Sequence, residues 1–365
     1  MNTSRGRWVL VVLVLLLVAA GAGYWRYRSG NPVASGGLTV YCAAGLKAPV
    51  EIVASEYQKQ FCNQVALSYG GSGALVSTQR VAKQGDLLIL ADGMSLAEAR
   101  KYDLVNEVIP FARQHLVLAV IKGNPKSIRT LADLARPGMR FGIVNPETAS
   151  AGKVLKRTLG EGWTDFFAKV TVMKPTVMDA GNDAALGAVD AAVVWDSTVA
   201  QWKDKLDAVE VPELAQAVDH ACIAVLAVSR QPTEALRFAR FLASPQFGNP
   251  VLARCGFKPI VGDDFVPQPT MVFYSGGVNR LAIEKTIGDF ATRERAKVTT
   301  AFNGCGILCA TMRTMAKNPS AALPDAYYAC DICFVPPVAD LYPEAVVLTE
   351  TDIVIAVPKG NPRHL

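Results

Sequence analysis

Three stretches of small and hydroxyl-bearing residues have the composition of an anion-binding site. They are 43–46 (Ala-Ala-Gly-Leu), 69–73 (Tyr-Gly-Gly-Ser-Gly) and 145–152 (Asn-Pro-Glu-Thr-Ala-Ser-Ala-Gly). Each stretch follows a run typical of a β-strand and precedes a helical pattern, so each is expected to present the unpaired N–H groups of a helix N-terminus. The positive end of the helix dipole favours an anion there. One such junction alone is usually an ordinary turn, but three in one chain indicate a site for a small oxyanion.

Other chemistry has little support. The phosphate-binding pattern G-x-x-x-x-G-K-[ST] is absent. The three histidines are His115, His220 and His364, and no nucleophile and base occur at a known catalytic spacing. His115 and His220 stand at the starts of two expected strands, which favours a structural role. The sequence therefore predicts a binding protein that is not an enzyme and needs no cofactor.

The junctions are expected to lie on an α/β framework. Strand and helix patterns alternate from residue 38, and the apolar runs 86–92 and 115–125 are typical of strands buried on both faces. This order predicts largely parallel sheets in two lobes joined by two crossing strands. Lobe one would comprise 38–118 and 220–262, and lobe two 119–219, within a solute-binding domain over 38–265. Ligands of such sheets bind outside the carboxyl ends of the strands, so the junctions should face the cleft between the lobes.

Part of this pattern recurs further along the chain. Val40-Tyr41 matches Val272-Phe273, and YGGSGAL at 69–75 matches FNGCGIL at 302–308. The segment 86–92 matches 325–331, and 120–126 matches 357–363. Four matches in one order indicate a duplicated unit. We therefore expect residues 268–365 to form an incomplete repeat of the first lobe.

The motifs LTVYCAAGL, YGGSGAL, DLLILAD, NPETASAG and DAAVVWD, in this order, resemble those of periplasmic molybdate-binding proteins. That family comprises the solute receptors of ABC importers. The resemblance covers residues 38 to about 262 and implies a two-lobed, hinged periplasmic-binding fold. It also implies that a tetrahedral oxyanion, molybdate or tungstate, is held by neutral donors and delivered to an ABC permease in the membrane.

The resemblance also implies which residues bind the ligand. They are Ala44, Gly45, Ser72, Gly73, Ala91, Ser150, Ala151, Asn182 and Trp195. Gly45 stands where the family has a serine and Trp195 where it has a tyrosine, so two hydroxyls of the family pattern are missing. The alternative is therefore a ligand-sensing or scaffold module of the same fold that no longer transports.

Eight cysteines leave a third possibility open. Cys305 and Cys309, with Cys330 and Cys333, form a C-x₃-C and C-x₂-C pattern that suits disulfides, buried thiols or a soft-metal site. A metal site there would make the chain a thiol- or metal-handling protein. Cys222 and Cys255 are expected in one lobe, where they could pair.

The charge and the N-terminal segment indicate where the protein lies. The net charge of +5 is modest and the basic residues are scattered, so nucleic acid is not an expected partner. Trp8–Trp25 is a run of 18 residues without a charge, long enough at ~1.5 Å per residue to cross a bilayer. Residues 1–30 are therefore expected to be a membrane anchor or a cleaved signal peptide, and 31–37 a linker. Either reading makes the rest of the chain extracytoplasmic.

The anchor can be tested by fractionation. If Trp8–Trp25 stays attached, the protein should remain in the membrane fraction after an alkaline wash, because the apolar run buries itself in the bilayer. Mass spectrometry of the N-terminus provides the measurement. A soluble form that starts near Gly23 would show cleavage instead.

Overall fold

The computed structural model describes residues 37–342 and 344–348, and the chain divides at residue 265 into two compact units. The expected anchor at 1–30 and the last repeat match at 357–363 lie outside the described residues. Within the described ranges, no helix has the length and apolar composition to cross a membrane.

The first unit begins with a β-α-β arrangement that places two of the small-residue junctions. Its strands and helices are β1 (Leu38–Ala43), η1 (Ala44–Leu46), α2 (Lys47–Phe61), β2 (Val65–Gly70), α3 (Ser72–Ala82), β3 (Leu87–Leu90) and α4 (Gly93–Lys101). Strand β1 pairs in parallel with both β2 and β3, so the carboxyl ends of all three lie at one edge. The alternating Leu38, Val40 and Cys42 are all buried, as the period of a strand requires.

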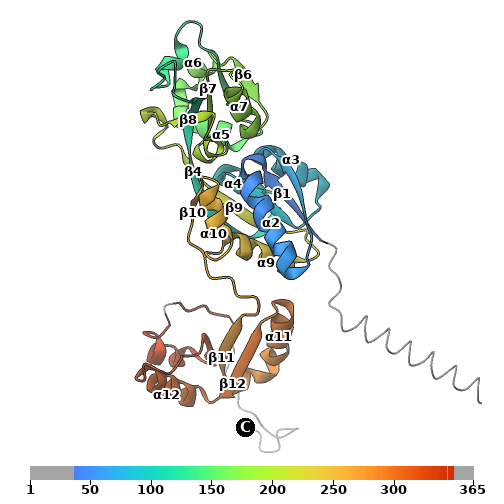
Figure 1. Cartoon of the computed structure of the whole chain (residues 1–365). Coiled ribbons are helices and arrows are strands. Elements are labelled where there is room, and N and C mark those ends of the chain that lie inside the picture. Colours follow the sequence, from blue (N-terminus) through green and yellow to red (C-terminus); the bar gives the residue numbers. More distant parts are fainter. Residues whose placement is uncertain (1–36, 343, 349–365) are drawn as a thin grey trace, which may run out of the picture. The chain divides into compact units, whose positions relative to one another are not determined.

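Two long strands connect the lobes. Strand β4 (Val105–Ile121) pairs with β9 (Val218–Leu226) up to His115 and with strands of lobe two from Leu116 onward. The lobe boundary therefore lies at residue 115, not at 118 as the sequence indicated. Because β4 and β9 run between the lobes in opposite directions, they pair antiparallel with each other and with their neighbours. The expectation of largely parallel sheets holds only away from this crossing (Figure 1).

Lobe two is a second α/β layer. Its elements are η2 (Ala132–Ala135), β5 (Phe141–Val144), α5 (Ser150–Leu159), η3 (Gly160–Gly162), α6 (Trp163–Phe167), β6 (Val172–Lys174), α7 (Val177–Ala185), β7 (Ala191–Trp195), α8 (Asp196–Ala200), β8 (Leu206–Val209) and η4 (Pro212–Leu214). Strand β5 lies between β6 and β7 and is parallel to both. Between β4 and β5 the chain forms only the short 3₁₀ turn η2.

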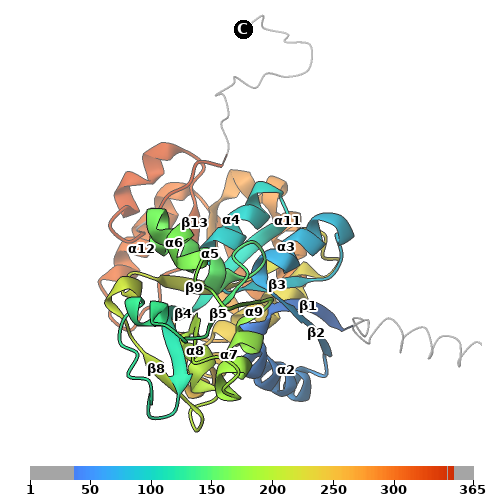
Figure 2. The ribbon, with the colours of Figure 1, turned by 90° about the horizontal axis from the view of Figure 1, so that it is seen from above.

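The chain then returns to lobe one and completes its core. It forms α9 (Pro232–Ala243), α10 (Gly248–Arg254) and β10 (Lys258–Pro259). Figure 2 shows α3 and α4 on one face of β1, β2 and β3, with α2 on the other. Helices α2 and α9 meet through Tyr57, Phe238 and Phe241, whose ring centroids lie 5.2 Å apart in the two pairs that include Tyr57. All three side chains are fully buried.

The second unit has the element order of the beginning of the first. It contains β11 (Thr270–Gly276), η5 (Gly277–Asn279), α11 (Arg280–Arg293), β12 (Lys297–Asn303), α12 (Cys305–Ala316), β13 (Ala326–Tyr328), η6 (Ile332–Phe334) and η7 (Pro336–Val338). Its strand order β12-β11-β13, all parallel, is that of β2-β1-β3. The register pairs Val40 with Leu87 and Phe273 with Ala326. If Asp86 is matched to Asp325, Leu87 corresponds to Ala326, and their strand partners Val40 and Phe273 correspond to each other. The sequence comparison had matched Val40 to Val272, one residue earlier.

Candidate anion-binding cleft

A small cavity lies between the two lobes of the first unit, where the strand ends converge. Its volume is about 10 Å³, roughly what one water molecule needs. The residues that line it are Ala43, Ala44, Gly45, Leu46, Gly70, Gly71, Ser72, Ala91, Gln114, Ala149, Ser150, Thr176, Val177 and Trp195. None of them is charged. The lobes are therefore closed around a space that only neutral groups face.

Three helices begin at this cavity, one from lobe one and two from lobe two. Helix α3 begins at Ser72, α5 at Ser150 and α7 at Val177. The first N–H groups of a helix have no acceptor within it. In α3, the N–H of Ala74 donates across the cleft to the carbonyl of Thr148 at 3.1 Å. The N–H groups of Ser72 and Gly73 have no acceptor within α3 and lie at the positive end of its dipole.

Two buried serines, Ser72 of lobe one and Ser150 of lobe two, line the cavity, and each hydroxyl oxygen accepts a hydrogen bond from its own lobe. Ser72 Oγ accepts a hydrogen bond from the Ala91 N–H at 3.1 Å, and Ser150 Oγ accepts one from Trp195 Nε1 at 3.3 Å. A hydroxyl has one proton to donate. Each oxygen accepts from a protein N–H, so each hydroxyl still has its own proton to donate. Both serines start a helix, so hydroxyl and N–H groups converge.

Trp195 stands at the position of the family's tyrosine, and the resemblance implied that its indole N–H could donate to the ligand. Trp195 is 1 % exposed, and its N–H donates to Ser150 instead. The indole reaches the serine because Trp195 ends β7 and its side chain lies against the start of α5. The Trp195 indole therefore acts on the cavity through the Ser150 hydroxyl that it contacts.

Gly45 lacks the hydroxyl of the family pattern for a reason that lies in lobe two. A Cβ atom at Gly45 would lie 2.9 Å from Cγ2 of Val177, closer than real Cβ contacts. The Gly45 carbonyl accepts a hydrogen bond from Gln201 Nε2 of lobe two at 3.3 Å. Because residue 45 has no side chain, its backbone can lie close to Val177 of lobe two in the closed form.

Gln114 was not predicted and lies at the centre of the site. Its side chain is 1 % exposed, donates from Nε2 to the Ala91 carbonyl at 2.9 Å, and accepts from Ser197 Oγ at 3.2 Å. It therefore ties β4 to the end of β3 in lobe one and to α8 in lobe two. A single glutamine inside a strand carries no signal of this role.

The remaining predicted residues lie at different distances from the cavity. Ala44, Gly45 and Ala91 line it, whereas Gly73 and Ala151 occupy the second positions of α3 and α5 behind the lining residues. Asn182 is exposed in the second half of α7 and does not line the cavity. The start of that helix, at Thr176 and Val177, does so instead. The sequence Thr176-x-x-Asp179 was an available signal, since Thr176 Oγ1 accepts from the Asp179 N–H as a helix cap.

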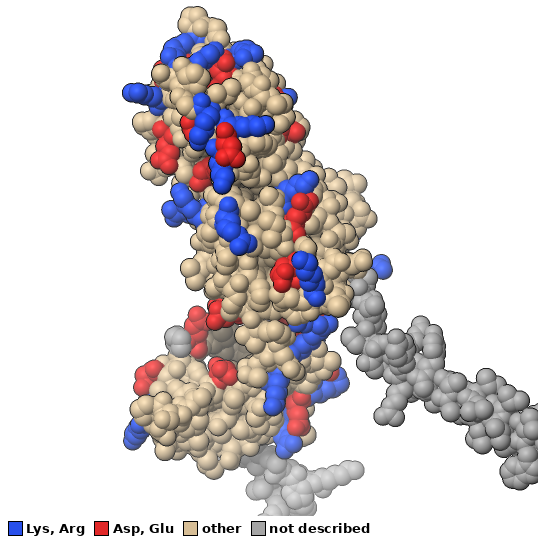
Figure 3. Space-filling view, viewed as in Figure 1, with Lys and Arg blue, Asp and Glu red and all other residues tan. Residues whose placement is uncertain are grey.

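Charged groups hold the lobes together beside the cavity. Lys153 Nζ of α5 lies 3.3 Å from both Ser95 Oγ and Glu98 Oε2 of α4. Nearby, Asp92 is fully buried and caps α4 by accepting from the Ser95 N–H at 2.7 Å. Burial raises the pKa of Asp92, and the Ser95 hydrogen bonds and Lys153 oppose that shift. On the face shown in Figure 3, acidic and basic side chains of the first unit are interspersed.

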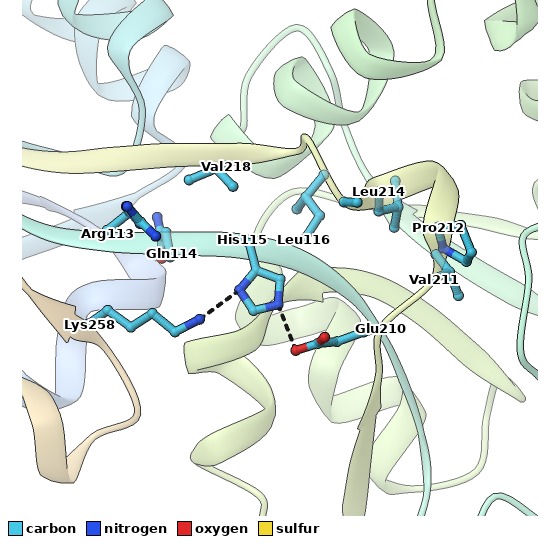
Figure 4. Close-up of a pocket in the computed structure, with 11 residues that line it drawn as sticks. Arg113, Gln114, His115, Leu116, Glu210, Val211, Pro212, Leu214, Val218 and Lys258 are labelled. Carbon is cyan, nitrogen blue, oxygen red and sulfur yellow. Dashed lines mark hydrogen bonds and ion pairs between the residues drawn. The ribbon is translucent and has the colours of Figure 1, made fainter.

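A larger groove of about 420 Å³ runs along β4 at the hinge (Figure 4). His115 lies at its centre, with Nδ1 2.8 Å from Asp196 Oδ2 and Nε2 3.4 Å from Glu210 Oε1. Lys258 Nζ lies 3.4 Å from His115 Nδ1. The histidine thus connects residues that lie before and after the crossing.

The cysteines are free thiols in the described structure. Cys222 packs in the core on the α3 and α4 side of the sheet, and Cys255 against the core on the α2 side. The proposed pairing of these two is therefore wrong, because the sheet separates them. Within the described residues, no group of three or more His, Cys, Asp or Glu side chains is placed to hold a metal ion.

Comparison with known proteins places the first unit. A family model described as bacterial extracellular solute-binding protein matches residues 38–258. The molybdate-binding protein ModA of Mycobacterium tuberculosis is 27 % identical over 255 residues, which are 69 % of this chain and 96 % of the relative.

Two solved structures share the fold. The periplasmic molybdate-binding protein of Azotobacter vinelandii has a TM-score of 0.53 and 20 % identity, and covers 62 % of this chain and 100 % of its own. A periplasmic thiamin binding protein has a TM-score of 0.54 and 17 % identity, and covers 63 % of this chain and 85 % of its own. The fold alone therefore does not determine the solute.

Lobe closure depends on the absence of a side chain at Gly71. A Cβ atom there would lie 2.4 Å from the Thr148 carbonyl oxygen of lobe two, although the φ of −69° would suit alanine. Gly71→Ala should therefore disfavour the closed form by about 1–3 kcal/mol. Small-angle X-ray scattering should show a larger radius of gyration.

Gly70→Ala is the matched control. Its Cβ would meet only the Leu75 side chain of the same lobe, at 3.1 Å, and that side chain can move. We expect no change in the radius of gyration for this variant. An equal change in both variants would mean that Gly71 does not limit closure.

Proposed function

We propose that this chain, which belongs to the family of bacterial extracellular solute-binding proteins, binds a tetrahedral oxyanion between its lobes and delivers it to an ABC importer. Molybdate or tungstate is the proposed solute. Residues 1–30 are proposed to hold the receptor at the outer face of the cytoplasmic membrane. No reaction is assigned to the protein.

The observation that carries the proposal is the pair of serine hydroxyls at two helix N-termini, facing a cavity without charged side chains. A buried anion loses its hydration, and oriented N–H and O–H groups are the neutral replacement for it. Ser72 and Ser150 supply such protons from opposite lobes. Binding both at once would favour the closed form, because the anion interacts with lobe two only after closure.

The lining residues disfavour other classes of solute. A metal ion or an organic cation needs acidic or strong ligand side chains, and the cavity has no Asp, Glu, His or Cys among its lining residues. A large organic solute needs a pocket of hundreds of Å³, whereas this closed cavity of about 10 Å³ must open even for a tetrahedral oxyanion. A compact anion requires the least opening of the lobes.

The choice among tetrahedral oxyanions rests on relationship rather than on geometry. Sulfate, molybdate and tungstate share charge and shape and differ in size. The sequence relative from Mycobacterium tuberculosis is a molybdate-binding protein, which supports molybdate or tungstate. Val177, whose methyl group stands over Gly45, lies at the wall that would discriminate by size.

The proposal predicts thermal protection by the right anion. At a concentration 100-fold above its dissociation constant, the solute should stabilise the first unit by ~2.7 kcal/mol, because it binds only the folded state. Calorimetry with molybdate, tungstate, sulfate and phosphate provides the measurement and ranks them. If none of the four moves the melting curve at millimolar concentration, the chain is better read as a sensing or scaffold module that has lost its ligand.

Ser72 should contribute most strongly to affinity from lobe one. A hydrogen bond to a charged group contributes about 1.5–3 kcal/mol, so Ser72→Ala should weaken oxyanion binding by about 10- to 150-fold. Isothermal titration calorimetry measures this loss. The fold should be nearly unchanged, since alanine keeps α3 intact.

Two control variants define the site. Ser77→Ala changes an exposed serine of the same helix and should bind normally. Cys305→Ala, at the corresponding helix start of the second unit, should also bind normally, because no second lobe follows it among the described residues. If Cys305→Ala loses as much affinity as Ser72→Ala, the assignment of the binding site to the first unit is wrong.

A further inference from the structure

Two thiols meet at the strand ends of the second unit. Cys305 begins α12, directly after β12, and Cys330 follows β13. The Cys330 N–H donates to Cys305 Sγ at 3.2 Å. The same contact in the first unit joins the Ala91 N–H to Ser72 Oγ at 3.1 Å. Cys305 thus takes the place of Ser72, and Cys330 takes the place of Ala91. The second unit therefore has two thiol side chains where the first has a hydroxyl and a methyl group.

Gly276 makes room for both cysteines. It ends β11, between the ends of β12 and β13. A Cβ atom at this glycine would lie 2.6 Å from Cys305 Sγ and 2.9 Å from Cys330 Cβ. Both side chains thus occupy the space left by one missing side chain. Cys305 is the first residue of α12 and Cys330 lies two residues after β13, so both stand at the carboxyl ends of strands that flank β11.

The neighbouring cysteines are directed elsewhere. Cys309 Sγ lies 3.6 Å from the Tyr327 hydroxyl and donates to the Phe334 carbonyl at 3.4 Å. The Cys333 N–H donates to Asp331 Oδ1 at 2.8 Å, and its side chain is exposed. Of the four cysteines in this unit, Cys305 and Cys330 are therefore the pair that the fold presents to each other.

The described part of the second unit, up to residue 348, has a small apolar core. Its apolar cluster of buried residues consists of Leu308, Cys309, Met312 and Val338. Helix α11 buries none of its residues, whereas its counterpart α2 packs against α9 and α10. Small units with a thin core usually depend on a covalent link or a metal, and disulfides persist in extracytoplasmic proteins.

We propose that Cys305 and Cys330 form a disulfide in the exported protein. The exposed Cys330, as its thiolate, attacks a disulfide oxidant of the extracytoplasmic compartment and displaces one of its sulfurs as a thiol. Cys305, buried beside it, then attacks the Cys330 sulfur and displaces the second. One S–S bond forms and one breaks, both cysteines lose their protons, and the oxidant leaves as two thiols. The bond joins the start of α12 to the end of β13.

Peptide mapping tests the bond on the full-length chain exported by its host. Free thiols are blocked with N-ethylmaleimide before lysis, and the protein is digested with trypsin without reductant. Cys305 and Cys309 remain in one peptide, and Cys330 and Cys333 in another. We expect these two peptides to be linked and to separate on reduction with a gain of two hydrogen atoms. Four blocked cysteines would overturn the proposal.

Single variants assign the link. Cys309→Ser and Cys333→Ser should retain it, whereas Cys305→Ser and Cys330→Ser should lose it. A link that survives in Cys305→Ser, or that disappears in Cys309→Ser, would assign the bond to another pair. This readout does not depend on the solute, so it stays separate from a failure of the oxyanion proposal.

Thermal unfolding of the wild-type chain with and without reductant is a second test of the bond. It does not depend on how well the variants fold. Reductant should lower the melting temperature of one transition of the wild-type chain by on the order of 10 °C, since the bond restricts the unfolded state of a small unit. The melting of Cys330→Ser should not respond to reductant. An unchanged wild-type transition would contradict the disulfide.

Discussion

An anion that is buried in a site without a positive charge loses its hydrogen bonds to water, and protein N–H and O–H groups must replace them. The cleft of this protein is arranged around that requirement. Ser72 and Ser150 each begin a helix, and each hydroxyl oxygen already accepts an N–H from a neighbouring strand end. Each hydroxyl therefore has a fixed oxygen and a proton still available to a ligand. Oriented dipoles of this kind need no rearrangement when charge enters, which is why a site without lysine or arginine is physically reasonable.

The same small residues serve the approach of the lobes. Gly71 faces the Thr148 carbonyl, which leaves no space for a side chain, and Gly45 faces the Val177 methyl group, which would have to shift to admit one. A glycine-rich strand end therefore does two things at once. It exposes N–H groups to a ligand, and it allows the backbone of one lobe to contact the other. Ligand binding and lobe closure are therefore coupled, because both depend on the absence of side chains at Gly45 and Gly71.

Much of this arrangement could be predicted from local patterns. The helix starts at Ser72 and Ser150 and the buried strand at 87–90 follow from periodicity and from small residues at strand ends. Contacts between residues that are far apart in the sequence could not be predicted from these local patterns. Asn182 was placed by analogy and lies exposed in a helix. Gln114, Val177 and the direction of the Trp195 indole depend on how the two lobes meet. The antiparallel crossing of β4 and β9 was hidden for the same reason.

Strand β4 has a further consequence for the energetics of closure. Successive side chains of a strand point to opposite faces, and Gln114 turns toward the cleft while its neighbours Arg113 and His115 line the hinge groove of Figure 4. Gln114 borders both spaces. A rotation of the lobes about this strand therefore reshapes both together. Thermodynamic reciprocity then makes them linked variables: any occupant of the groove that changes the affinity of the cleft has its own affinity changed by the same factor.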